Sequence, residues 1–102
     1  MKRILIVDDA ATVRLFHRAI LESAGYTVEE AINGIEALEK ALATPFDLYL
    51  VDINMPKLDG YGFLRELRDQ AITQVPAIMI STEAKANDQT RAYQAGANAY
   101  IL

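Results

Sequence analysis

The sequence predicts an α/β fold built on a parallel β-sheet, because three observations agree. Short apolar, β-prone segments alternate along the chain with segments whose apolar residues recur at helical spacing. The most apolar strand candidates are hydrophobic at consecutive positions, which indicates that both of their faces are buried. No internal repeat, low-complexity stretch or linker divides the 102 residues. We therefore expect one domain in which right-handed crossovers connect the strands.

The first strand and helix have clear boundaries. Residues 4–7 (Ile-Leu-Ile-Val) form the expected strand, which stops at Asp8 and Asp9. The following helix ends at Gly25, a residue that suits the position just after a helix. Its apolar residues recur at helical spacing: Val13, Phe16, Ile20, Leu21 and Ala24.

The next strand, residues 26–30, is less apolar, which favours a position at the edge of the sheet. A second helix is expected to begin at Asn33, because an Asn cap followed by Glu36 is a capping pattern. We expect this helix to end at Thr44-Pro45. Its predicted buried stripe consists of Ile35, Leu38 and Leu42.

The apolar run 46–51 predicts a buried central strand that ends at Asp52. Asp59-Gly60 indicates a turn into a third helix, without requiring the Asp59 carboxylate to join a site. The residues of this helix expected to point inward are Phe63, Leu64 and Leu67.

A fourth strand is expected at residues 75–80, with Pro76 at its entry, where a missing N–H matters least. An alanine-rich helix over 84–95, ended by Gly96, precedes a fifth strand at 98–102.

Composition narrows the classes of function. A net charge of −4 and a pI of about 4.8 argue against a nucleic-acid binder, which usually carries a basic face. Cysteine is absent, which excludes disulfides and Cys-ligated metals. No apolar run approaches the roughly 18 residues of a membrane span, and the start of the chain does not resemble a signal peptide. We therefore expect a soluble, cytoplasmic protein without a membrane partner.

Polar side chains follow three of the predicted strands. In open parallel sheets, sites lie outside the carboxyl ends of the strands. The residues there are Asp8, Asp9, Asp52, Asn54, Ser81 and Thr82. Three adjacent carboxylates repel one another unless a cation is present, and an all-oxygen ligand set selects a hard cation. With one or two direct carboxylates and open positions, Mg²⁺ is favoured over Ca²⁺, which needs more ligands. An aspartate beside such an ion can act as a nucleophile toward phosphorus.

A purely structural interpretation competes with this chemistry. Asp-Asp after a strand also occurs as a helix-cap pair, so Asp9 is a candidate cap for the first helix. The presence of all the polar groups at the same end of one sheet favours the chemical interpretation.

Several motifs together carry a family resemblance over the whole chain. They are Ile4-Leu5-Ile6-Val7-Asp8-Asp9, Asp52-Ile53-Asn54-Met55-Pro56, Asp59-Gly60, Ser81 and Gly96-Ala97-Asn98-Ala99-Tyr100. The chain resembles the receiver domain of bacterial two-component response regulators, of the stand-alone chemotaxis type. The resemblance implies a doubly wound, flavodoxin-like sheet with strand order 2-1-3-4-5.

The resemblance also implies roles for these residues. Asp52 would be the phosphoacceptor, Ser81 the hydroxyl that contacts the phosphoryl group, and Tyr100 an aromatic switch. Mg²⁺ would be bound directly by Asp9 and Asp52, mainly through water by Asp8, and by the backbone carbonyl of Asn54. The phosphoryl group would come from a histidine of a sensor kinase or phosphotransfer protein. His17, the single histidine, is expected to lie on a helix surface or in a groove, remote from the site.

The chain departs from the family pattern at its end. It stops at Leu102, one residue before the usual lysine and before a fifth helix, so residues 1–102 are interpreted as a C-terminally truncated receiver domain. We expect Mg²⁺ binding to survive, and phosphorylation or its coupling to Ser81 and Tyr100 to be impaired. We also expect self-association, for instance as a dimer, through the sheet face that a fifth helix would cover.

Three other functions compete with a phosphoacceptor switch that signals to a downstream protein. The first is an interaction or oligomerisation module with the same fold but an impaired switch. An aspartate-based phosphatase is disfavoured because Asn54 stands where a second acid would be useful. A flavin-binding domain is disfavoured because no Ser/Thr/Gly-rich loop follows the first strand.

Overall fold

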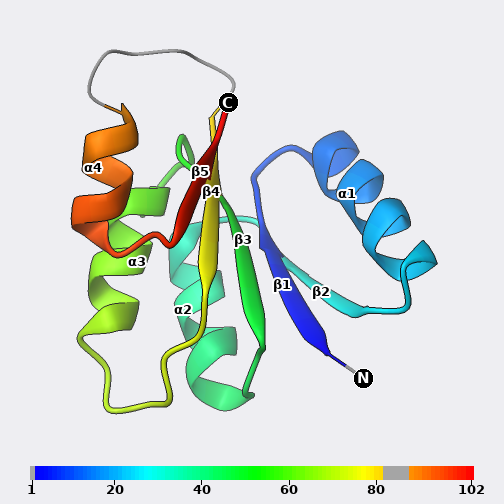
Figure 1. Ribbon diagram of the computed structural model, residues 1–102, viewed down its shortest axis with the longest axis horizontal. Helices are drawn as coiled ribbons and strands as arrows, with labels where there is room; N and C mark the ends of the chain where they lie inside the picture. Colours follow the sequence, from blue (N-terminus) through cyan, green and yellow to red (C-terminus); the bar gives the residue numbers. More distant parts are fainter. Residues whose placement is uncertain (1, 82–87) are drawn as a thin grey trace.

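In a computed structural model, the chain forms a parallel sheet with helices on both faces (Figure 1). The structure describes residues 2–81 and 88–102. The strands are β1 (Arg3–Val7), β2 (Thr27–Ala31), β3 (Leu48–Asp52), β4 (Ala77–Ile80) and β5 (Ala99–Ile101). The helices are α1 (Ala11–Ser23), α2 (Gly34–Ala43), α3 (Gly60–Arg68) and α4 (Asp88–Ala95).

The strand order is β2-β1-β3-β4-β5, and every neighbouring pair is parallel. This order confirms the predicted doubly wound, flavodoxin-like fold. Helices α2, α3 and α4 cover one face of the sheet, and α1 lies on the other (Figure 1). The described ranges contain four helices.

The main core lies between the sheet and the helices α2, α3 and α4. Tyr49, Val51 and Met79 point to this side and are at most 3% exposed. The predicted inward residues of α3 are confirmed, since Phe63, Leu64 and Leu67 are each 0% exposed. Burial therefore alternates along β3 and β4.

The opposite face of β3 and β4 is only half covered. Its side chains, Leu48, Leu50, Ile78 and Ile80, are all of intermediate burial. We call these four residues the open face. Although both faces were expected to be buried, only β1 is nearly fully covered on both sides, because α1 lies over its end of the sheet.

Helix α2 begins as predicted but buries different residues. The Asn33 side chain caps it by accepting from the Glu36 N–H at 2.9 Å. The predicted buried stripe is wrong at Ile35 and Leu42, each 47% exposed. Gly34 packs closely against Leu58, and the inward positions are filled instead by the small residues Ala37 and Ala41.

Helix α1 is attached mainly by charged groups. None of its side chains is buried, and Phe16 is 65% exposed. The Glu30 carboxylate on β2 accepts from Arg14 Nε at 2.8 Å and from Arg18 Nη1 at 2.5 Å. The suggested cap at Asp9 is wrong, because the N-cap is Ala10, whose N–H donates to Asp8 Oδ1 at 2.8 Å.

The remaining boundaries differ slightly from the prediction. Strand β3 begins at Leu48 rather than residue 46, and β4 begins at Ala77, directly after the proline. Thr82 and the expected start of the last helix at residue 84 lie outside the described residues. In the described ranges, no helix is both long enough and apolar enough to cross a membrane.

The attachment of α1 to β2 predicts a pH-dependent contribution to stability. Hydrogen bonds from Arg18 and Arg14 lower the pKa of the Glu30 carboxyl below its ordinary value of 4.5. This contribution is present above pH 4.5 and is lost as the pH falls through the folded-state pKa. Glu30→Gln should lower the free energy of unfolding at pH 7 by about 1 kcal/mol. Urea denaturation at pH 7 and pH 3 measures the difference, which should be smaller at the lower pH.

Glu39→Gln is the matched control, because Glu39 is an exposed glutamate on α2. An equal loss of stability for Glu30→Gln at both pH values would contradict the electrostatic attachment of α1.

Candidate functional site

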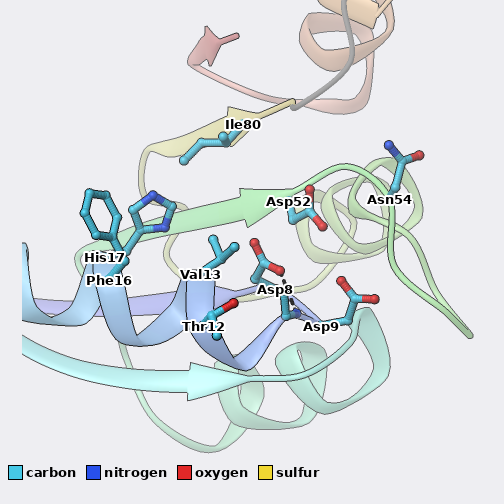
Figure 2. A pocket seen from close by; sticks show the side chains of 10 residues that line it. Asp8, Asp9, Thr12, Val13, Phe16, His17, Asp52, Asn54 and Ile80 are labelled. Atoms are coloured by element: carbon cyan, nitrogen blue, oxygen red, sulfur yellow. Dashed lines mark hydrogen bonds between the residues drawn. The ribbon is translucent and has the colours of Figure 1, made fainter.

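The pairing of β1 with β3 brings three aspartates together. Val7 is the register partner of Val51, so Asp8 and Asp52 follow at neighbouring strand ends. One carboxylate oxygen from each of Asp8, Asp9 and Asp52 lies within 4.8 Å of the other two. Figure 2 shows the three side chains grouped at the carboxyl ends of β1 and β3. The sequence correctly predicted this cluster.

Backbone contacts hold Asp8 in place. Its N–H donates to the Ala31 carbonyl at 3.1 Å, and its own carbonyl accepts from Arg14 Nη1 at 2.8 Å. Its carboxylate accepts from the Ala10 N–H and is 9% exposed, whereas Asp9 is exposed. One carboxylate of the cluster is therefore fixed, and the next remains open to solvent.

Asp52 is the last residue of β3 and is half-buried. The backbone of Asn54, and then that of Ile53, favours the charged form of its carboxyl and lowers its pKa, which offsets part of the effect of burial. Gly60 lies so close behind Asp52 that an added Cβ would overlap the Asp52 carbonyl oxygen and crowd Met79. The start of α3 is thus packed directly against the segment that carries Asp52.

Burial and mutual repulsion change the acidity of the cluster. Burial, and then the charges of Asp8 and Asp9, raise the pKa of Asp52 to about 6. Burial is also the main reason that the pKa of Asp8 is raised, and the charge of Asp9 adds to the shift. A bound cation would offset this repulsion. The donors are all oxygens and include an exposed carboxylate, so the residues present fit a hard cation such as Mg²⁺.

A hollow of about 630 Å³ opens beside the aspartates. It continues along α1, past Val13 and Phe16, and reaches Ile80 on the open face (Figure 2). His17 also lines this hollow. The prediction that His17 lies in a groove is therefore confirmed, but the prediction that it is remote from the aspartates is wrong. Val13, Phe16 and His17 of α1 were not predicted to border the site. Phe16 and His17 follow Val13 by three and four residues, so the sequence did indicate that they share one face of the helix.

The other predicted site residues are Asn54, Ser81 and Tyr100, and they lie outside the group of three carboxylates. Asn54 is exposed at the edge of the hollow, and its side chain points away from the three carboxylates (Figure 2). Ser81 is 2% exposed and follows Ile80, the register partner of Asp52. Tyr100 is half-buried against the core on the α3–α4 side.

Asp59 is the cap of α3, as expected of a turn residue. Its side chain accepts from the Gly62 N–H at 2.8 Å. Its carboxylate therefore already has a structural partner, and it does not belong to the group of Asp8, Asp9 and Asp52.

Comparison with known proteins gives a consistent result. Residues 4–102 match the family model described as the response regulator receiver domain. Among curated proteins, the chain is 40% identical over 101 residues to a gliding motility regulatory protein of Myxococcus xanthus, covering 98% of this chain and 13% of that protein. It is 37% identical over 100 residues to the transcriptional regulatory protein ResD of Bacillus subtilis, covering 98% and 41%.

Solved structures agree with the sequence comparison. The chemotaxis protein CheY4 of Vibrio cholerae has a TM-score of 0.93 and 34% identity, with 100% of this chain and 86% of that chain covered. The response regulator TrrA of Thermotoga maritima, solved in complex with Mg²⁺ and BeF, has a TM-score of 0.89 and 31% identity, with the same coverage. The chain spans less than half the length of the two curated relatives described above.

The crowding of the carboxylates predicts how Asp52 titrates in metal-free protein. Its carboxyl should titrate near pH 6 when the carboxyl carbons are followed by ¹³C NMR. Asp9→Asn should lower that midpoint, because it removes a neighbouring negative charge. Asp69→Asn, at an exposed carboxylate after α3, should leave it unchanged. An Asp52 midpoint at the ordinary value of 3.8 would contradict the proposed burial and repulsion.

The same shift has a consequence for folding. Because the folded state holds the Asp52 proton more tightly, stability falls as the pH rises from about 4 through about 6. In the absence of metal at pH 7, Asp52→Asn should therefore be more stable than the parent, by on the order of 2 kcal/mol.

Proposed function

The chain belongs to the response regulator receiver domains, and we propose that it is a phosphoacceptor that takes a phosphoryl group onto Asp52. The observation that carries the proposal is the group of three carboxylates within 4.8 Å at the carboxyl ends of β1 and β3. Such a domain regulates other proteins and does not turn over an external substrate.

We assign the chemical roles from the family resemblance, and the grouping of the three carboxylates supports them. The Asp52 carboxylate attacks phosphorus, and the bond from phosphorus to a partner's histidine nitrogen breaks, leaving its electron pair on the imidazole. Asp9 and Asp52 would hold Mg²⁺ directly, Asp8 mainly through water, and Asn54 through its backbone carbonyl. Mg²⁺ bound there would neutralise charge on the transferring group. Asp8 orients the cluster through its fixed backbone.

Ser81 and Tyr100 are the proposed switch residues. Ser81 follows the strand partner of Asp52, which places its backbone beside the end of β3. Its N–H donates to the Ile101 carbonyl at 2.9 Å, so a shift of Ser81 toward a phosphoryl oxygen would also act on β5, which carries Tyr100. The surface formed by α4, β4 and β5 would then present a changed face to a downstream protein.

The proposed partners are a sensor histidine kinase or phosphotransfer protein and a protein target, in the cytoplasm. The net charge of −4 supports a protein target rather than a nucleic acid. A sensor protein of Escherichia coli, EvgS, is 38% identical over 95 residues, covering 93% of this chain and 8% of that protein. This similarity supports a place in two-component signalling.

Phosphorylation can be tested with acetyl phosphate and Mg²⁺ on a gel that retards phosphoproteins. The parent chain should shift, and Asp52→Asn or excess EDTA should abolish the shift. Asp47→Asn is the control, because Asp47 is an exposed carboxylate at the opposite end of β3. A shift that persists in Asp52→Asn would disprove the assignment. A parent chain that never shifts would favour an interaction module with the same fold.

A second candidate function, self-association, is favoured by the open face. One of its four half-buried side chains, Ile80, lines the same hollow as Phe16 of α1. Phe16 and Ile20 of α1 are 65% and 50% exposed. Monomers seldom expose an apolar patch larger than a few hundred Å². We propose that a second copy of the chain covers this face, with the exposed apolar residues of α1 supplying the complementary surface. Such an interface would also cover the hollow beside the aspartates, because Phe16 and Ile80 line both.

Sedimentation velocity over a range of protein concentrations tests this association. Ile20→Ser should weaken the dimer by about tenfold, the usual effect of removing roughly 1.4 kcal/mol of apolar contact. Ile35→Ser is the matched control, because Ile35 is 47% exposed on α2, across the sheet from α1. A well-folded monomer at high concentration would rule out the second candidate.

A further inference from the structure

A buried hydrogen bond joins the first turn of α3 to the first residue of α4. The Tyr61 hydroxyl donates to Asp88 Oδ1 at 3.0 Å and lies 3.3 Å from the Asp88 carbonyl oxygen. Both side chains are buried, with Tyr61 2% and Asp88 5% exposed. Because a buried carboxylate is costly without a hydrogen-bond donor, this contact determines where the Asp88 side chain can lie.

A third residue holds the same tyrosine. The guanidinium carbon of Arg91, on α4, stands 4.3 Å from the centroid of the Tyr61 ring. At this distance a guanidinium is attracted to the face of an aromatic ring. The first turn of α4 therefore contacts both the hydroxyl and the ring of Tyr61. We call Tyr61, Asp88 and Arg91 the α3–α4 tether.

At its α3 end, the tether is connected to Asp52. Tyr61 directly follows Gly60, whose N–H donates to the Ile53 carbonyl at 2.9 Å. Gly60 is in turn packed against the Asp52 carbonyl. A displacement of the backbone that follows Asp52 must therefore move Gly60 and, with it, the backbone of Tyr61.

At its α4 end, the tether acts on a helix with few other anchors among the described residues. Arg68 of α3 donates from Nε and Nη2 to the carbonyl of Gly96, directly after α4, at 3.1 and 2.9 Å. Besides Asp88, the buried residues of α4 are Ala92 and Ala95, whose side chains are single methyl groups. Contacts between methyl groups do not fix the position of a helix along its axis, whereas large interdigitating side chains do. Helices α3 and α4 lie side by side on one face of the sheet (Figure 1).

We infer that Tyr61 and Asp88 are positioning residues that set the place of α4 and transmit changes at Asp52 to the surface of α4. The positioning of α4 stands on the contacts alone. The transmission of a signal rests on the proposed phosphoacceptor function.

Hydrogen exchange tests the positioning. Tyr61→Phe keeps the ring but removes the hydroxyl, so the amides of α4 should exchange about tenfold faster, as expected for loss of a buried hydrogen bond to a charged group. The amides of α2 should keep their rates. Tyr93→Phe, at a tyrosine of α4 that is 46% exposed, is the matched control and should change neither helix. Equal acceleration throughout the chain, or none, would overturn the inference.

A second pair of measurements tests the role of the tether separately from the proposed phosphoacceptor function. Beryllofluoride with Mg²⁺ should shift the amide NMR resonances of α4 in the parent, and these shifts should shrink at least twofold in Tyr61→Phe. Full-sized shifts in Tyr61→Phe would overturn the transmission role. A parent that binds no beryllofluoride would instead refute the phosphoacceptor function, while the hydrogen-exchange result still decides the positioning role. Asp88→Asn, which keeps an acceptor oxygen for Tyr61, should show a smaller effect in both measurements.

Discussion

The register between β1 and β3 is the constraint on which the rest of the site depends. Val7 opposite Val51 places the ends of the two strands side by side, and the aspartates follow directly. A slip of one residue would exchange the two faces of a strand, so burial of Val51 on the core side fixes the position of Asp52. Apolar packing in the middle of the sheet therefore holds together carboxylates that repel one another at its edge.

That register also explains how much of the molecule could be predicted. Element types and the aspartate cluster depend on local patterns, apolar runs that end in carboxylates, and on the general rule that parallel strands align their ends. The buried stripe of α2 depends instead on rotation about the helix axis. Gly34 against Leu58 sets that rotation, and this contact joins segments that are distant in sequence. The apolar spacing at Ile35 and Leu42 carried no information about it.

The contacts that attach the helices likewise could not be predicted from local sequence patterns. The Glu30 carboxylate is bound by Arg14 and Arg18 across the gap between α1 and the edge strand, a pairing that only the assembled sheet creates. The Tyr61 hydroxyl similarly meets Asp88 only after α3 and α4 have packed on the same face. In the sequence, Tyr61 is indistinguishable from an ordinary core aromatic. Side chains of this kind become interpretable only once their partners are known.

The attachment of α1 has a consequence for how this protein can diverge. Since no α1 side chain is buried, substitutions on most of its surface change few core contacts. The exposed positions of the helix are therefore free to vary without loss of the fold, provided that its two arginines are kept. A helix that borders the aspartate hollow and is so lightly constrained is well suited to acquire new recognition preferences after gene duplication. Copies of this domain could in this way come to recognise different partners while the sheet and the carboxylate cluster remain unchanged.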